Sequence, residues 1–225
     1  MNLQMCLPIE IRPISIMQGR DADVLDVLIP LHVSCTNPRI LDATYGLGTI
    51  WQGCSYCPDA TMDIRPLDGV DLIDDFTVMA SVADASFDVI VFDPPHLPTA
   101  AASENGSKMW EHRYGITADD KNRAGDNVIP LFVPFLRQAK RVLVGNGIVL
   151  AKIADLVHNH RYQWQQVAFV NACREMGLTP CDMLIKHDYN GGNLKSSKWQ
   201  ETYHVRKAHC FWIVARNSDR CERSG

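Results

Sequence analysis

The sequence lacks any hydrophobic run long enough to cross a membrane. Its longest apolar stretch, about Val128 to Leu136, contains two prolines and is far shorter than the roughly 20 residues of a membrane span. The N-terminal residues also lack the basic segment and apolar core of a secretory signal peptide. We therefore expect no membrane partner and a cytoplasmic protein.

The sequence also lacks the cysteine spacing of disulfide or zinc proteins and the net positive charge of proteins that coat nucleic acid. The eight cysteines lack the spacing of a disulfide framework, so we expect reduced and mostly buried thiols. The CxxC from Cys54 to Cys57 has no second pair at zinc spacing, and we expect no metal site. A net charge of −4 argues against non-specific coating of nucleic acid, although it leaves room for a local basic patch.

What the chain does have is an alternation of strand-like and helix-like segments from about residue 38 onward. A length of 225 residues fits a single domain that spans 1–225. Helical periodicity covers 128–144 and 163–176. Strand-like runs lie at 39–42, 60–63, 70–73, 89–92, 147–152, 181–186 and 210–215. This order predicts an α/β fold, a doubly wound, mostly parallel seven-stranded sheet with helices on both faces.

Two long polar segments interrupt the alternation, at about 97–127 and 187–209. Loops of this length inside a compact domain are uncommon unless they have a function. In an open parallel sheet, ligands bind in the crevice beyond the carboxyl ends of the strands. We therefore look for functional residues at the strand ends and in these two loops.

A glycine-rich turn follows the first predicted strand, in the sequence Asp42-Ala-Thr-Tyr-Gly-Leu-Gly-Thr49. Gly46 and Gly48 let the backbone turn tightly and approach a ligand closely. Trp51 stands where a dinucleotide fingerprint needs a third glycine, so the motif fits a nicotinamide cofactor poorly. An acid at the strand end suits a ligand with an ammonium or hydroxyl group. The alternative interpretation is an ordinary strand–turn–helix corner.

Two further acids follow the next predicted strands. Asp63 ends the second strand, about twenty residues after the first motif, where a carboxylate can bind both hydroxyls of a ribose. Asp75 follows the third strand and can accept a hydrogen bond from an exocyclic adenine amine. Each acid alone is more often a solvated surface charge. Together with Asp42 they form a set at successive strand ends.

The most specific motif is Asp93-Pro94-Pro95-His96, at the end of the fourth predicted strand. Proline has no N–H to donate and fixes φ, so the Pro94 carbonyl can stay outside the sheet ladder. The Asp93 carboxylate and this carbonyl can together accept both hydrogens of a planar amine, which localises the nitrogen lone pair. His96 can stack on a substrate ring. The alternative is a proline-rich strand terminator, which the buried strand before it and the long polar loop after it make less attractive.

These motifs resemble those of class I S-adenosylmethionine-dependent methyltransferases, specifically the amino-methyltransferases of DNA. The match is close over residues 38–96 and looser to the last predicted strand. The resemblance implies a Rossmann-like methyltransferase fold with S-adenosylmethionine as cofactor. The residues that it assigns to the cofactor are Asp42, Thr44, Gly46, Gly48, Asp63 and Asp75. The tetrad that it makes catalytic is Asp93, Pro94, Pro95 and His96, where His96 replaces the usual aromatic residue.

The resemblance favours methyl transfer to N6 of adenine in DNA over N4 of cytosine. An RNA amino-methyltransferase, a protein-amide methyltransferase and a non-catalytic nucleic-acid-binding partner of the same fold remain alternatives. We expect no separate target-recognition domain within these 225 residues, and a homodimer is possible on this interpretation. The second polar loop contains both cations and aromatic residues. This composition fits nucleic-acid contacts and a solvated hairpin about equally well. The predicted nucleic-acid contacts are Lys195, Lys198, Trp199, Tyr203, Arg206 and Lys207.

Overall fold

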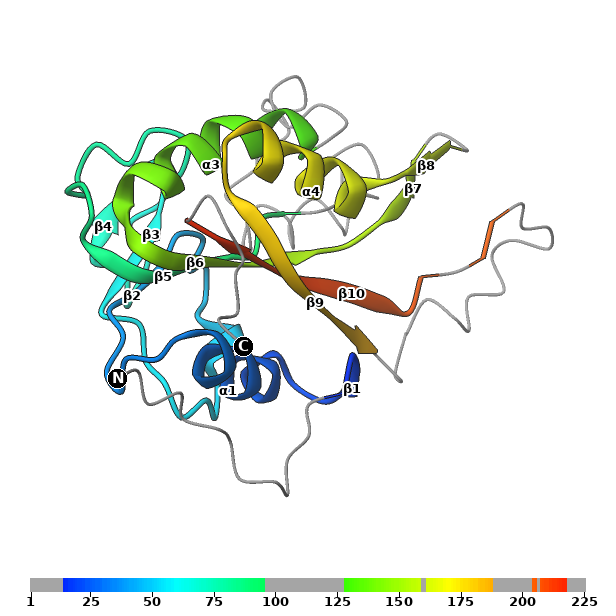
Figure 1. Ribbon diagram of the computed structural model, residues 1–225, viewed down its shortest axis with the longest axis horizontal. Coiled ribbons are helices and arrows are strands. Elements are labelled where there is room, and N and C mark those ends of the chain that lie inside the picture. Colours follow the sequence, from blue (N-terminus) through cyan, green and yellow to red (C-terminus); the bar gives the residue numbers. More distant parts are fainter. Residues whose placement is uncertain (1–13, 96–127, 159–160, 188–203, 206, 218–225) are drawn as a thin grey trace, which may run out of the picture.

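The computed structural model describes residues 14–95, 128–158, 161–187, 204–205 and 207–217. Its centre is an eight-stranded sheet of order β1-β9-β10-β6-β5-β2-β3-β4 (Figure 1). The strands are β1 (Ile16–Gln18), β2 (Ile40–Asp42), β3 (Ala60–Asp63), β4 (Leu72–Ile73), β5 (Phe87–Phe92), β6 (Leu143–Ile153), β9 (Thr179–His187) and β10 (His209–Arg216). Neighbouring strands are parallel except β10, which is antiparallel to both β6 and β9. The predicted doubly wound, mostly parallel sheet is therefore confirmed.

All seven predicted strands are present, and β1 is an additional eighth. It lies parallel to β9, with Ile16 opposite Ile185 and Gln18 opposite His187. A three-residue strand at the edge of a sheet is too short to show alternating burial in the sequence. The predicted count of seven strands was therefore one too low. The missed strand, β1, is stabilised by its pairing with β9.

Helices lie on both faces of the sheet, as predicted. The helix α1 (Asp21–His32) covers one face, and α3 (Ile129–Val142) and α4 (Gln165–Glu175) cover the other (Figure 1). In the fully described stretch 40–95 the only helical element is the short 3-10 turn η1 (Thr49–Trp51). No helix in the described part of the chain is long and apolar enough to span a membrane.

The sheet separates two hydrophobic cores, and β5 contributes to both. Ile90 and Phe92 face α3, where Phe92 stacks on Phe135 with ring centroids 3.7 Å apart. Val89 and Val91 belong to the core on the opposite face, together with residues of α1. These four β5 residues are fully buried, which explains why β5 is a continuous apolar run in the sequence.

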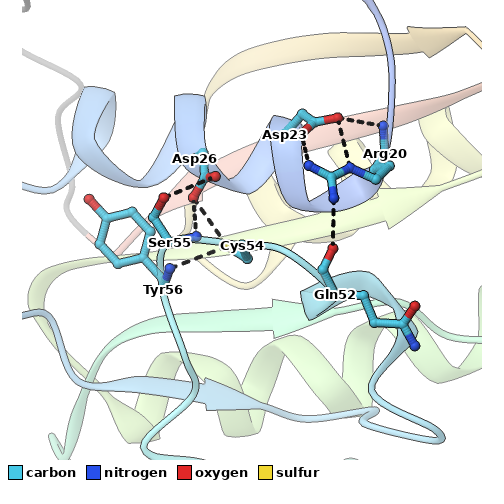
Figure 2. A network of polar contacts seen from close by, with 7 residues as sticks. All are labelled: Arg20, Asp23, Asp26, Gln52, Cys54, Ser55 and Tyr56. Atoms are coloured by element: carbon cyan, nitrogen blue, oxygen red, sulfur yellow. Dashed lines mark hydrogen bonds and ion pairs between the residues drawn. The ribbon is translucent and has the colours of Figure 1, made fainter.

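Polar contacts fix α1 to the chain that follows η1 (Figure 2). Asp26 accepts hydrogen bonds from the Cys54 thiol at 3.2 Å and from the Ser55 amide at 2.8 Å. The Arg20 guanidinium donates to the Gln52 carbonyl at 3.4 Å. Burial raises the pKa of Cys54 to about 11, so this thiol stays protonated and acts as a hydrogen-bond donor. Cys54 thus serves the packing of α1 against this loop.

A small hairpin, β7 (Leu156–His158) and β8 (Arg161–Gln163), follows β6 and leads into α4. The two predicted polar loops lie largely outside the described residues, which omit 96–127, 188–203 and 206. The prediction that 1–225 forms one domain remains a prediction.

Candidate active site

Three of the predicted acids meet at one edge of the sheet. Asp42 ends β2 and Asp63 ends β3, while Asp93 directly follows β5. β2 pairs in parallel with both β3 and β5, with Asp42 opposite Thr61 and Val91. The carboxyl ends of the three strands therefore lie side by side, with Asp42 between the other two acids. This is the position at which open α/β sheets bind ligands.

Thr44 links the glycine-rich turn to the Asp93 motif. Its amide donates to the Asp42 carboxylate at 2.9 Å, and its hydroxyl oxygen accepts the Asp93 amide at 2.7 Å. The predicted cofactor turn and the predicted catalytic motif are thus joined by a single side chain. A displacement of one would be transmitted directly to the other.

Asp63 stabilises the turn and is itself engaged by Arg65. Its Oδ2 accepts the Gly46 amide at 3.1 Å and an Arg65 guanidinium nitrogen at 3.0 Å. Its Oδ1 accepts the backbone amide and Nε of Arg65, both at 2.9 Å. A carboxylate has about four acceptor positions, so those of Asp63 are filled. A ribose can bind Asp63 only where the Arg65 side chain gives up its place.

Gly46 and Gly48 both adopt left-handed backbone conformations, with φ of 56° and 63°. Among the described residues, a Cβ at Gly46 would come within 4 Å only of the Thr44 carbonyl, at 3.9 Å, so this part of the chain leaves the space beside Gly46 open to a ligand. A Cβ at Gly48 would lie 2.6 Å from the Tyr45 hydroxyl oxygen. Gly48 is therefore required by the fold of the turn itself, whether or not a ligand approaches there.

Asp42 is fully buried at the centre of this edge and is held by neutral donors. Its carboxylate accepts the Trp51 indole N–H at 2.6 Å in addition to the Thr44 amide. Burial raises the pKa of Asp42 to about 7, and the charges of Asp93 and Asp63 act in the same direction. The two hydrogen bonds favour the ionised form and offset this effect only in part.

Asp93 belongs to a chain of alternating charges that the sequence analysis did not identify. Lys152, near the end of β6, contacts the Asp93 carboxylate at 3.1 Å and the Asp21 carboxylate at 3.0 Å. Lys186, near the end of β9, contacts the other Asp21 oxygen at 2.9 Å. The four side chains are at most 22% exposed, so solvent screens these pairs less than it screens surface pairs. Burial alone would lower the pKa of Lys152, but the carboxylates of Asp93 and Asp21 outweigh it and raise this pKa above its usual value.

The position of Asp21 depends on the unexpected strand β1. Gln18 lies opposite His187 in the parallel β1–β9 pair, so the chain enters α1 at the same sheet edge as Lys186. Asp21 then occupies the first turn of α1, where a carboxylate also interacts favourably with the helix dipole. The sequence offered one sign of this pair of lysines. Lys152 and Lys186 each lie near the end of a predicted strand, where a lone cation can reach the carboxyl edge of the sheet.

The remaining predicted residues are less closely connected. Asp75 is exposed on the turn after β4, where its carboxylate accepts the amide and hydroxyl of Thr77 at 2.7 Å. Pro94 is buried and Pro95 partly buried beyond the end of β5. Lys207 lies over the ring of Tyr162. The predicted residues His96, Lys195, Lys198, Trp199, Tyr203 and Arg206 lie outside the described part of the chain.

Comparison with known proteins gives similarity at the level of structure. No protein-family model matches the chain. No curated protein matches it either. A candidate DNA modification methylase from Thermus thermophilus, solved with S-adenosyl-L-methionine, is 14% identical with a TM-score of 0.42. The match covers 67% of this chain and 55% of that protein, so the chain spans about half of its length.

Two other solved structures match over most of both chains. A candidate sarcosine dimethylglycine methyltransferase from Galdieria sulphuraria is 12% identical, with a TM-score of 0.51 over 88% of this chain and 85% of that one. A candidate methyltransferase from Bacillus halodurans C-125 is 13% identical, with a TM-score of 0.51 over 87% and 99%. At such identities the similarity concerns the fold. The chain has the Rossmann-like fold of methyltransferases.

Proposed function

We propose that the chain transfers a methyl group from S-adenosylmethionine to an exocyclic amine of a nucleobase, with N6 of adenine in DNA as the favoured target. The observation that carries the proposal is the junction of Asp93-Pro94 with the glycine-rich turn through Thr44. This contact supports the proposal, because it joins the carboxylate that we propose binds the amine to the turn that we propose binds the cofactor, at the carboxyl edge of a methyltransferase fold.

The residues at this edge of the sheet suit a cofactor that contains an adenosine. Among the described residues, the space beside Gly46 is open to a ligand close to the backbone, and Asp63 offers a carboxylate for ribose hydroxyls once Arg65 moves. Asp75 lies after the next strand, in the order in which adenine would follow ribose. When bound, the cofactor would supply an electrophilic methyl group on a positively charged sulfur.

We predict that Asp63→Asn weakens S-adenosylmethionine binding by roughly tenfold or more, because a charge-assisted hydrogen bond to ribose becomes a neutral one. Isothermal titration calorimetry measures this directly. Asp68→Asn is the matched control, since Asp68 is an exposed acid on the loop that also holds Arg65. Equal affinities for wild type and Asp63→Asn would remove Asp63 from the cofactor site.

On this proposal, Asp93 and Pro94 activate the amine without removing its proton beforehand. The carboxylate accepts one N–H, and the Pro94 carbonyl, beyond the last residue of β5, accepts the other. Two acceptors draw the planar nitrogen toward tetrahedral geometry and localise its lone pair for attack on the methyl group. The C–S bond would break as the N–C bond forms, a neutral thioether would leave, and the methylated nitrogen would then release one proton to solvent. The carboxylate also stabilises the positive charge that develops on nitrogen during transfer.

Lys152 orients the Asp93 carboxylate for this task. It contacts one carboxylate oxygen, Oδ2, and Asp21 holds Lys152 from the other side. Lys152 is thus a positioning residue that acts through Asp93.

We predict that Lys152→Met lowers kcat for methyl transfer by about tenfold or more and changes the affinity for S-adenosylmethionine little, because the Asp93 carboxylate loses the contact that orients it. Lys152→Arg can keep an ion pair with Asp93 and should restore part of the rate. Lys140→Met is the control, because Lys140 lies on α3 and contacts the Gly177 carbonyl instead. An unchanged kcat in Lys152→Met would show that Lys152 does not act on Asp93.

The proposal for nucleic acid includes phosphate contacts by Lys195, Lys198, Arg206 and Lys207, with Trp199 or Tyr203 stacking on a base. Duplex DNA would have to release the target base from the stack before its amine reaches Asp93. Incubation with radiolabelled cofactor and separate DNA, RNA and protein pools tests the substrate class. Label in DNA supports the proposal, whereas label in protein alone would contradict it.

A further inference from the structure

The β7–β8 hairpin presents aromatic side chains beside the proposed active site. Leu156 pairs with Gln163, and the hairpin begins only four residues after Lys152, a span of at most about 14 Å. Trp164, directly after β8, is 59% exposed. Tryptophan and tyrosine are enriched at the interaction surfaces of proteins, because each combines a large apolar ring with a polar group.

The exposed Trp164 is held by its neighbours rather than left loose. Its ring lies 4.3 Å from that of Tyr162, measured between centroids. Lys207 places its ammonium over the Tyr162 ring, 3.9 Å from the centroid. The Tyr162 hydroxyl donates to Asp155 at 2.9 Å, and the other Asp155 oxygen accepts the Gln166 amide, also at 2.9 Å.

Asp155 is 4% exposed and joins the hairpin to the first turn of α4. This anchoring fixes the orientation of Tyr162 and therefore of the ring packed against it. A pre-organised ring loses little conformational entropy on binding.

The charge around Trp164 favours a polyanion. Between residues 153 and 168 the sequence contains one acid, the buried Asp155, and between 204 and 211 it contains none. Arg161 is exposed on β8, and Lys207 lies against Tyr162. An exposed aromatic ring among cations is the combination with which proteins hold unpaired nucleic acid.

We propose that Trp164 is a stacking platform for an unpaired base next to the target nucleotide, with Lys207 contacting an adjoining phosphate. This inference rests on the proposed function for its choice of partner, but it concerns binding and not chemistry. The Trp164 surface is in addition to the nucleic-acid contacts predicted for 187–209. Lys207 belongs to both surfaces. A second copy of the chain is the competing occupant, and the experiment below distinguishes it.

The test is binding of a fluorescently labelled single-stranded oligodeoxynucleotide, measured by anisotropy at several salt concentrations without cofactor. We expect Trp164→Ala to weaken binding about ten- to hundredfold and Trp164→Phe to keep most of it. The salt dependence should separate the two kinds of contact. Trp164→Ala should leave the slope of log affinity against log salt unchanged, while Lys207→Ala should reduce it by about 0.7.

The control for surface change is Val167→Ala, an exposed apolar residue one turn further along α4, which should bind like wild type. Trp164 is the N-cap residue of α4 but forms no side-chain cap hydrogen bond, so its replacement removes no helix cap. Unchanged affinity of Trp164→Ala, or no binding by wild type at low salt, would overturn the inference. A wild-type dimer that Trp164→Ala converts to monomer in sedimentation would assign Trp164 to a second copy instead.

This outcome is separable from that of the proposed function. Oligonucleotide binding that depends on Trp164, without methyl transfer, would support the stacking platform and contradict the proposed methyltransferase activity. Methyl transfer that depends on Asp93, with oligonucleotide binding unchanged in Trp164→Ala, would support the proposed activity and contradict the stacking platform.

Discussion

Replacing Asp93 by alanine is expected to lower methyl transfer by at least about a thousandfold while the protein stays folded and binds S-adenosylmethionine. On the proposed mechanism the carboxylate acts on charge that develops in the transition state, so its removal should affect the rate far more than ground-state binding. Lys152 keeps Asp21 as a partner at 3.0 Å, so the substitution leaves no isolated buried charge. Single-turnover rates and calorimetry on the same preparation measure the two quantities.

Asp93→Asn distinguishes charge from hydrogen-bond acceptance at this position. The amide keeps one acceptor oxygen but loses the negative charge and places a donor near Lys152, so transfer should also be strongly impaired. Asp88→Asn is a suitable control, since Asp88 lies on the same strand and pairs with Arg39 away from the site. Retention of more than about a tenth of the wild-type rate in Asp93→Ala would assign amine activation to another residue.

A second large effect is expected in the free energy of unfolding as a function of pH. The pKa of Asp42 rises from 3.8 in the unfolded chain to about 7 in the folded protein, so the folded state binds the extra proton between these values. Stability is therefore lost as the pH rises from about 4 to about 8. A shift of about three units corresponds to roughly 4 kcal/mol over this window.

Urea denaturation of wild type and Asp42→Asn at several pH values isolates this contribution. The variant cannot ionise at position 42, so its stability should fall less between pH 4 and pH 8 than that of wild type. The difference between the two proteins removes the titration of groups that do not interact with Asp42. Parallel curves would mean that Asp42 ionises in the folded protein as readily as in the unfolded chain.

Much of the fold was predictable because the buried strands leave a strong signal. Val89 to Phe92 is apolar at every position, since each face of β5 packs on a different core. The helix α1 was missed although Val24, Leu25, Leu28 and Ile29 repeat with helical spacing and are buried. Pro30 in its last turn and the short β1 before it weakened the pattern. The sheet was thus easier to predict than its N-terminal edge.

The candidate site was predictable where it follows the chain and not where it depends on contacts across the fold. Strand-end acids can be read from local sequence, as Asp42, Asp63 and Asp93 were. The Lys152–Asp21 pair joins positions 131 residues apart, and its formation depends on the pairing of β1 with β9. Local sequence contains no information on that register.

The structure also changes the physical meaning of two predicted residues. Gly48 was expected to make room for the cofactor, but the nearest atoms to its Cβ position belong to Tyr45. Asp63 was expected to have a carboxylate available for ribose hydroxyls, but Arg65 contacts both oxygens of this carboxylate. Both contacts lie within a few residues along the chain, and both depend on side-chain conformations that sequence spacing does not determine.

Asp93 is proposed to direct methyl transfer to an exocyclic amine of a nucleobase. The most direct measurement is to incubate DNA with radiolabelled S-adenosylmethionine and either the wild-type protein or Asp93→Ala, digest the DNA to nucleosides, and identify the labelled product. We expect labelled N6-methyladenine with the wild-type protein and almost none with the variant. Label at a ring carbon, or equal label with both proteins, would contradict the proposal.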